Sequence, residues 1–227
     1  MNTRPAAPEP LRRAIERIEQ LRAIDPVASW ARRRSAPLAD GRTGDVLKGQ
    51  WLGHALHPLL TDLPLGCWLG SAVLDVAGGK RSRHASTRLI ATGLALVPVT
   101  AAAGIADWST VRDKREERVG IVHGVGNVVV TLLYVRSWRR RHQGRHLTGM
   151  MWGLAGGGLA LATGYLGGHL SFNLGTGVGD RGIREQPTTH VPIQQAQTGS
   201  PTPSADGHRK PVAVPDGGPV ESWEGLD

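Results

Sequence analysis

The sequence predicts an all-α fold: an integral membrane four-helix bundle with an N-terminal amphipathic surface helix and a disordered C-terminal tail. Three observations predict it, namely four long apolar runs, short connections between these runs, and polar, proline-containing stretches toward both ends of the chain. We therefore divide the chain into an N-terminal arm at residues 1–50, a transmembrane domain at 51–179 and a tail at 180–227.

The apolar runs have about the length that a helix needs to cross a bilayer, roughly 20 residues at about 1.5 Å per residue. Because the connections are short, consecutive helices should lie antiparallel to each other. Run 121–135 reaches the spanning length only with its flanking residues, and run 89–105 contains Pro98, which can kink a helix. The four runs are 55–77, 89–105, 121–135 and 147–170.

The N-terminal arm contains an amphipathic segment at residues 11–24. Leucine and isoleucine recur on one helical face of this segment, and arginine and glutamate surround that face. We expect Pro26 to end the helix. A basic amphipathic helix can lie on a membrane surface, and packing on a partner is the alternative. The tail, in contrast, has too few large apolar residues to offset the entropy of ordering it.

The formal net charge of +8 indicates contact with phospholipid headgroups rather than with nucleic acid. The arginines flank the apolar runs and are not interleaved with exposed aromatic residues. The single cysteine, Cys67, allows no disulfide framework within the chain. No nucleophile–base set and no phosphate-cradling loop is visible, so the sequence shows no catalytic motif and leaves enzymatic activity undecided.

The fourth apolar run carries small residues at a spacing that lets helices approach closely. They recur every fourth position on two faces, at Gly149, Gly153 and Gly157 and at Gly156, Ala160, Gly164 and Gly168. The spacing predicts tight packing of this helix, and it could also serve a homo- or hetero-oligomer.

Ionisable residues converge on one end of the predicted bundle. Antiparallel order places the start of the first and third helices and the end of the second and fourth helices in the same leaflet. Asp62 lies about a turn deeper than this end, while Asn127 and Tyr165 share helix faces with histidines. The histidines and the carboxylate at this end are His54, His57, Asp107, His123 and His169.

Three kinds of site fit this convergence. Imidazoles from facing helices can ligate a b-type haem, with His57 and His123 as the preferred axial pair and His169 as the next candidate. Asp62, Asn127 and Tyr165 would then orient the rings or the haem propionates. Alternatively, His54, His57, Asp107, His123 and His169 could hold a divalent metal, or the cluster could relay protons beside a quinone. In the third case these groups hydrogen-bond to each other and to headgroups and only set the helix register.

Four ordered motifs resemble a bacterial membrane family, the domain of unknown function 2231. They are HPLLTDLPLGCWLGSAVLDVAGG, GIADWS, RVGIVHGVGNVVVTLLY and GYLGGHLSFNLGTGVG, which together extend over about residues 51–179. Some relatives carry this membrane region ahead of a Rieske-type iron–sulphur domain, which implies proximity to electron transfer. No paired Cys-x-His motif follows Gly179, so a Rieske function would need a separate soluble partner.

The sequence therefore predicts a multi-pass protein of the cell membrane, either redox-associated or a non-catalytic anchor or assembly subunit for a soluble partner. The redox-associated protein would hold haem or act beside a quinone. Basic residues on both sides of the membrane nearly cancel in the positive-inside rule. Because translocation of the long basic N-terminal arm is harder than translocation of two short connections, we expect both termini in the cytoplasm.

Overall fold

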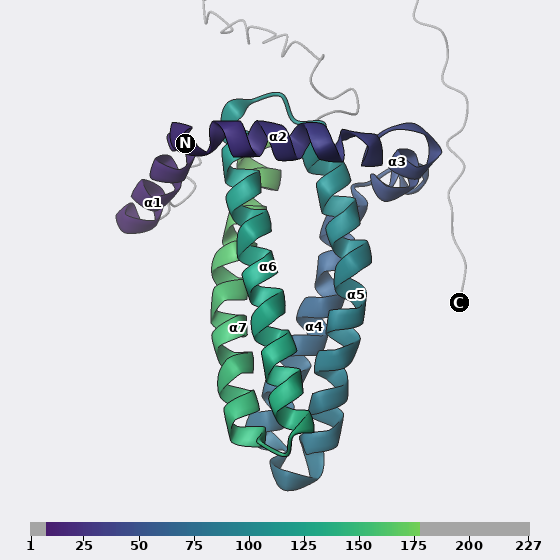
Figure 1. Cartoon of the computed structure of the whole chain (residues 1–227), viewed down its shortest axis with the longest axis vertical. Helices are drawn as coiled ribbons and strands as arrows, with labels where there is room; N and C mark the ends of the chain where they lie inside the picture. Colours follow the sequence, from purple (N-terminus) through teal and green to yellow (C-terminus); the bar gives the residue numbers. More distant parts are fainter. Residues whose placement is uncertain (1–7, 178–227) are drawn as a thin grey trace, which may run out of the picture. The chain divides into compact units, whose positions relative to one another are not determined.

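The computed structural model describes residues 8–177, which belong to the first of two compact units, Met1–Pro187. Every element in the described part is helical, which confirms the predicted all-α class. Its four long helices are α4 (Leu56–Ala77), α5 (Arg83–Ser109), α6 (Lys114–His142) and α7 (His146–Gly168) (Figure 1). The predicted disordered tail, at 180–227, lies outside the described residues.

The four long helices form two antiparallel hairpins that pack side by side. Helix α4 packs along α5, and α6 packs along α7. Further contacts join α5 to α6 and α4 to α7, so that α4 and α6 occupy diagonal positions (Figure 1). Side chains of α4 and α6 therefore meet in the centre of the bundle.

Within residues 8–177, three segments are long and apolar enough to cross a membrane: Leu56–Ala77, Gly79–Ser109 and Lys114–His142. Large apolar side chains point outward from the bundle; Val76 on α4 is 78% exposed and Leu161 on α7 is 79% exposed. Such surfaces suit contact with lipid. Helix α7 is not among the three segments, because its many glycines contribute little hydropathy. The chain is thus a multi-pass membrane protein.

The N-terminal arm forms three short helices, α1 (Glu9–Glu19), α2 (Asp25–Ser35) and α3 (Gly41–Leu47). The amphipathic helix ends earlier than the predicted 11–24, and a single 3-10 turn, Arg22–Ile24, follows it. Pro26 lies in the first turn of α2, where a backbone N–H would have no intrahelical acceptor, so proline costs no hydrogen bond there. Helices α1 and α2 pack on α6, while α2 and α3 pack on α5, and α2 lies across one end of the bundle (Figure 1).

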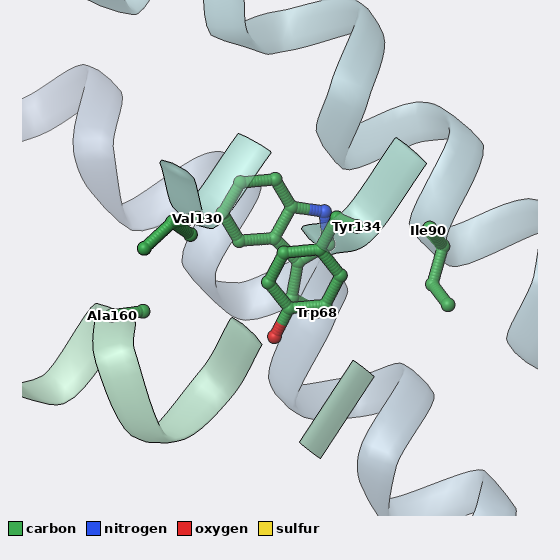
Figure 2. Packing of buried hydrophobic residues seen from close by; sticks show 5 residues of the cluster. All are labelled: Trp68, Ile90, Val130, Tyr134 and Ala160. Carbon is green, nitrogen blue, oxygen red and sulfur yellow. The ribbon is translucent and has the colours of Figure 1, made fainter. Parts of the chain in front are cut away.

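The core of the bundle is built on an aromatic pair from the diagonal helices. Trp68 of α4 and Tyr134 of α6 stack with ring centroids 4.0 Å apart and an interplanar angle of 14°. Val130 of α6, Ile90 of α5 and Ala160 of α7 complete this buried cluster (Figure 2). Each aromatic ring lies against a glycine of its own hairpin.

These two glycines occupy equivalent positions, and the equivalence extends over both hairpins. The Trp68 ring lies against Gly93 of α5, and the Tyr134 ring lies against Gly156 of α7. Helices α4 and α6 correspond at a spacing of 66 residues, and equivalent residues form contacts with each other. Three such pairs are His57 with His123, Trp68 with Tyr134, and Asp75 with Arg141.

Equivalent residues touch each other only near a two-fold axis. The hairpins are therefore two repeats of one helical unit, related by a pseudo-two-fold axis along the bundle, as in membrane proteins with parallel repeats.

The small residues of α7 serve this packing within the chain. An added Cβ would meet the Arg141 side chain at 2.6 Å from Gly149, and the Tyr134 ring at 3.0 Å from Gly156. The predicted tight packing of this helix is thus realised against α6. Gly158 and Gly164 have nothing within 4 Å of such a Cβ. An oligomer formed through α7 stays a prediction.

Candidate functional site

The structure brings together two of the predicted site residues, His57 and His123, inside one end of the bundle. His57 lies in the first turn of α4, and His123 lies in the third turn of α6. Their ring centroids are 6.5 Å apart, and the ring planes are nearly perpendicular at 89°. Both side chains are partly buried. This was the preferred histidine pair of the sequence analysis.

Each imidazole is held by the neighbouring helix of its own hairpin. The Nδ1 atom of His57 lies 2.9 Å from the carbonyl oxygen of Thr100, and Nδ1 of His123 lies 2.8 Å from that of Thr163. A carbonyl only accepts hydrogen bonds, so in both rings Nδ1 carries the proton. In the neutral form, Nε2 of both rings is then left with a lone pair.

Two glycines make room for these rings. A Cβ on Gly104 of α5 would lie 2.7 Å from Cε1 of His57, and a Cβ on Gly167 of α7 would lie 2.9 Å from Cε1 of His123. Both distances are below normal van der Waals contact. The glycines therefore let each imidazole reach the backbone of the neighbouring helix.

A proline in α4 helps to join the helices of the first hairpin. Pro64 has no N–H to donate to the carbonyl of Leu60 in the preceding turn. The Thr100 hydroxyl donates to that carbonyl at 3.3 Å. Thr100 thus contacts α4 twice, through its hydroxyl to Leu60 and through its carbonyl to His57.

The two imidazoles differ in the surroundings of Nε2. Asn127 donates from Nδ2 to Nε2 of His123 over 2.9 Å, so this ring is hydrogen-bonded at both nitrogens. Within the described residues, Nε2 of His57 has no such partner. Asp62, Asn127 and Tyr165 were predicted to lie beside the two histidines. Of these three, the structure places only Asn127 in contact with one of the rings.

The structure does not bring the other predicted residues to this pair. His54 precedes α4 and is exposed, Asp62 is exposed on α4, and Tyr165 on α7 is 41% exposed. Asp107 lies close to Gly177. In the part of the chain that the structure describes, no three His, Cys, Asp or Glu residues are grouped so that they could hold a metal ion.

His169 takes part in a different network, which the sequence analysis missed. Its Nε2 lies 2.8 Å from Oε1 of Glu19 in α1. Arg118 of α6 donates to both carboxylate oxygens of Asp25, at 2.6 and 2.8 Å, and to the backbone oxygen of Glu19 at 2.6 Å. This network attaches α1 and α2 to the end of the bundle. The guanidinium of Arg118 is thus engaged in holding the arm.

The Arg118 hydrogen bond lowers the pKa of Asp25 below its ordinary value. The pairing therefore contributes to docking of the arm at neutral pH, above the pKa of the free carboxyl. The contribution is lost on acidification, as the pH falls from about 4 through the lowered pKa.

A second polar cluster lies at the opposite end of the bundle. Arg141 of α6 donates from Nη2 and Nη1 to the Asp75 carboxylate of α4, at 2.5 and 2.8 Å, and its side chain is 1% exposed. Three buried serines surround the pair: Ser71, Ser86 and Ser137. Ser86 donates to Asp75 at 2.6 Å, and Ser137 accepts from Nε of Arg141 at 3.2 Å.

The sequence analysis assigned the arginines that flank the apolar runs to headgroup contact and did not single out Arg141. Asp75 itself could have indicated the pair, because a carboxylate within an apolar helix needs a cationic partner.

The comparisons with known proteins agree with this architecture. A family model described as "Predicted membrane protein (DUF2231)" matches residues 53–180, which is more than half of the chain. No curated protein and no solved structure gave a match. The matched residues contain α4 to α7, both histidines of the central pair and the Asp75–Arg141 pair. The chain therefore belongs to the DUF2231 family of predicted membrane proteins.

Proposed function

We propose that this chain is a redox-associated membrane protein in which His57 and His123 are the axial ligands of a b-type haem. The observation that carries the proposal is the way the two imidazoles are held. Histidines that ligate metals commonly donate the other ring N–H to a backbone carbonyl, which sets the tautomer and the ring orientation. Both rings have this arrangement, with Nδ1 on Thr100 and Thr163 respectively.

The spacing of the pair also supports a shared metal centre. Two imidazoles on opposite sides of one metal ion, bonded at about 2 Å each, have ring centres about 6 Å apart. The observed separation is 6.5 Å. A bare divalent cation would need further protein ligands beyond two imidazoles. Haem brings four nitrogen ligands of its own, so an axial pair is enough.

Haem ligation would require a rearrangement at His123. Asn127 must turn its amide away from Nε2 of His123, because that nitrogen has a single lone pair. Asn127 is therefore a competitor for the coordinating nitrogen rather than a group that orients it. A quinone is the alternative occupant. Its carbonyl oxygen can accept a hydrogen bond from a protonated imidazole, and no bond from a ring nitrogen to a metal is needed.

Absorption spectra of the detergent-purified protein, expressed with ample haem supply, test this function. We expect a Soret band and resolved α and β bands after dithionite reduction. His57→Ala or His123→Ala should abolish them, because each removes an axial ligand. His54→Ala, at an exposed position just before α4, is the matched control and should keep the spectrum, as should His169→Ala. Asn127→Ala should retain or increase haem content.

A colourless protein with no bound iron would contradict the haem proposal and favour a non-catalytic anchor. One observation supports this second function. Apolar side chains are exposed on α2 and just before α4: Val27 and Trp30 of α2 are 61% and 56% exposed, and Trp51 is 68% exposed. This surface could bind a soluble, iron–sulphur-containing partner. In that case the partner should copurify in stoichiometric amount and be lost when residues 8–35 are deleted.

We further propose that all four helices α4 to α7 cross the inner membrane, with both termini in the cytoplasm. Helix α7 spans 23 residues beside three apolar segments, enough for a bilayer crossing. Green fluorescent protein fused to the C-terminus should then fluoresce, whereas alkaline phosphatase fused there should be inactive. Active phosphatase would show the reverse orientation, or an odd number of crossings with the N-terminus inside.

A further inference from the structure

A basic hollow of about 460 Å³ lies at the end of the bundle opposite the histidine pair. It is formed by the turn before α5, the first turns of α5, the last turns of α6 and the start of α7. Three histidines and five cationic side chains contribute to the lining, and none of the lining residues is acidic. The charge of Arg141 is compensated by its ion pair with Asp75. The remaining four cations are Lys80, Arg81, Arg83 and Arg88.

The charge of these four residues is not compensated within the described residues. None of them takes part in any ion pair found there, and all four are exposed at the bundle end. Cations held around one concave surface repel each other, and their field attracts an anion. The hollow is therefore suited to a ligand that brings negative charge.

Two further residues of the lining indicate which kind of anion fits. His146, at the start of α7, has its Nδ1 atom buried without a hydrogen-bond partner in the described structure. A buried unpaired ring nitrogen is costly, and a turn of this ring toward a ligand oxygen in the hollow would supply the missing partner. Trp138 of α6 also lines the hollow, with its ring 4.6 Å from that of His142. Tryptophan at the end of a spanning helix is typical of headgroup depth.

We propose that this hollow binds the phosphate headgroup of an anionic phospholipid. It lies where three candidate spanning segments end or begin: α4 ends at Ala77, α5 begins at Arg83, and α6 ends at His142. Apolar surface therefore continues from the hollow along the bundle, where acyl chains can lie. Clustered cationic side chains at headgroup depth attract the phosphates of anionic lipids. This inference does not depend on the haem proposal.

The test uses the full-length protein in dodecyl maltoside, stripped of lipid and titrated with phosphatidylglycerol. Tryptophan fluorescence reports binding, since Trp138 lines the hollow. We expect a saturable change with phosphatidylglycerol and none with phosphatidylcholine at the same mole fraction. Glycerol 3-phosphate, the soluble headgroup probe, should bind much more weakly because it has no acyl chains to contact the helices.

Two matched triple variants locate the site. Arg81→Gln/Arg83→Gln/Arg88→Gln removes three cations of the hollow and should weaken binding by about tenfold or more. Arg139→Gln/Arg140→Gln/Arg145→Gln removes the same charge from the same end, but outside the lining, and should change binding little.

Equal weakening by both variants would overturn the site, because charge at this end alone would explain binding. Equal binding of phosphatidylcholine by the unaltered protein would overturn the proposal without any variant. Glycerol 3-phosphate binding as tightly as the lipid would also overturn it, in favour of a soluble phosphate ligand.

Discussion

Replacing Asp75 by Asn should destabilise the protein by about 3–5 kcal/mol, because it leaves the buried guanidinium of Arg141 without a counter-charge. The Arg141 side chain is 1% exposed, and two of its nitrogens donate to the Asp75 carboxylate. Arginine cannot lose its proton in a protein, so the charge stays in the bundle. The free energy of unfolding, measured by titration with sodium dodecyl sulphate, would show the loss.

The reciprocal variant should be milder. In Arg141→Gln, Asp75 can take up a proton and become neutral, which limits the cost of leaving it buried. Joint replacement, Asp75→Leu with Arg141→Met, removes both charges and should recover much of the lost stability. Arg139→Gln, at an exposed position on the same helix, is the control and should have little effect. If the two single variants at the pair were as mild as this control, the buried ion pair would not contribute to stability.

Replacing Gly93 by Ala should produce the second large effect. The added Cβ would lie 2.4 Å from Nε1 of Trp68 and 2.7 Å from its Cδ1, where no real contact is tolerated. The Trp68 ring cannot move freely, because it stacks on Tyr134 at 4.0 Å between centroids. Overpacking of this kind costs about 1–3 kcal/mol, although alanine otherwise favours a helix over glycine by about 1 kcal/mol.

Gly158→Ala provides the matched comparison in the second hairpin. Nothing lies within 4 Å of a Cβ at Gly158, so only the gain in helix propensity should appear. Thermal unfolding followed by circular dichroism should therefore give a lower midpoint for Gly93→Ala and an unchanged or higher midpoint for Gly158→Ala. A midpoint for Gly93→Ala no lower than that for Gly158→Ala would contradict overpacking against Trp68.

The histidine pair shows which properties of the site can be predicted from the sequence and which cannot. His57 and His123 could be assigned to one end of the bundle because helix order and connection length are local properties of the chain. The partner of each ring could not be assigned, since it depends on the rotation of the neighbouring helix about its own axis. His169 shows the consequence: it lies at the predicted end, yet it faces Glu19 of the arm.

The sequence by itself determined the all-α class, the positions of the long apolar helices, their antiparallel order and the end of the bundle shared by His57 and His123. These properties follow from apolar run length and from short connections, which act over neighbouring residues. Only the tertiary structure decided the Asp75–Arg141 pair, the contact of Asn127 with His123, the docking of α1 and α2, and the equivalence of the two hairpins.

The physical reason is that buried polar groups and close-packed glycines are matched across helices, where one turn of register or a rotation of the helix changes every partner. The equivalence of the hairpins shows this well. His57 and His123 keep one residue type, whereas Trp68 corresponds to Tyr134 and Asp75 to Arg141, so equivalent contacts persist even where the residue types differ.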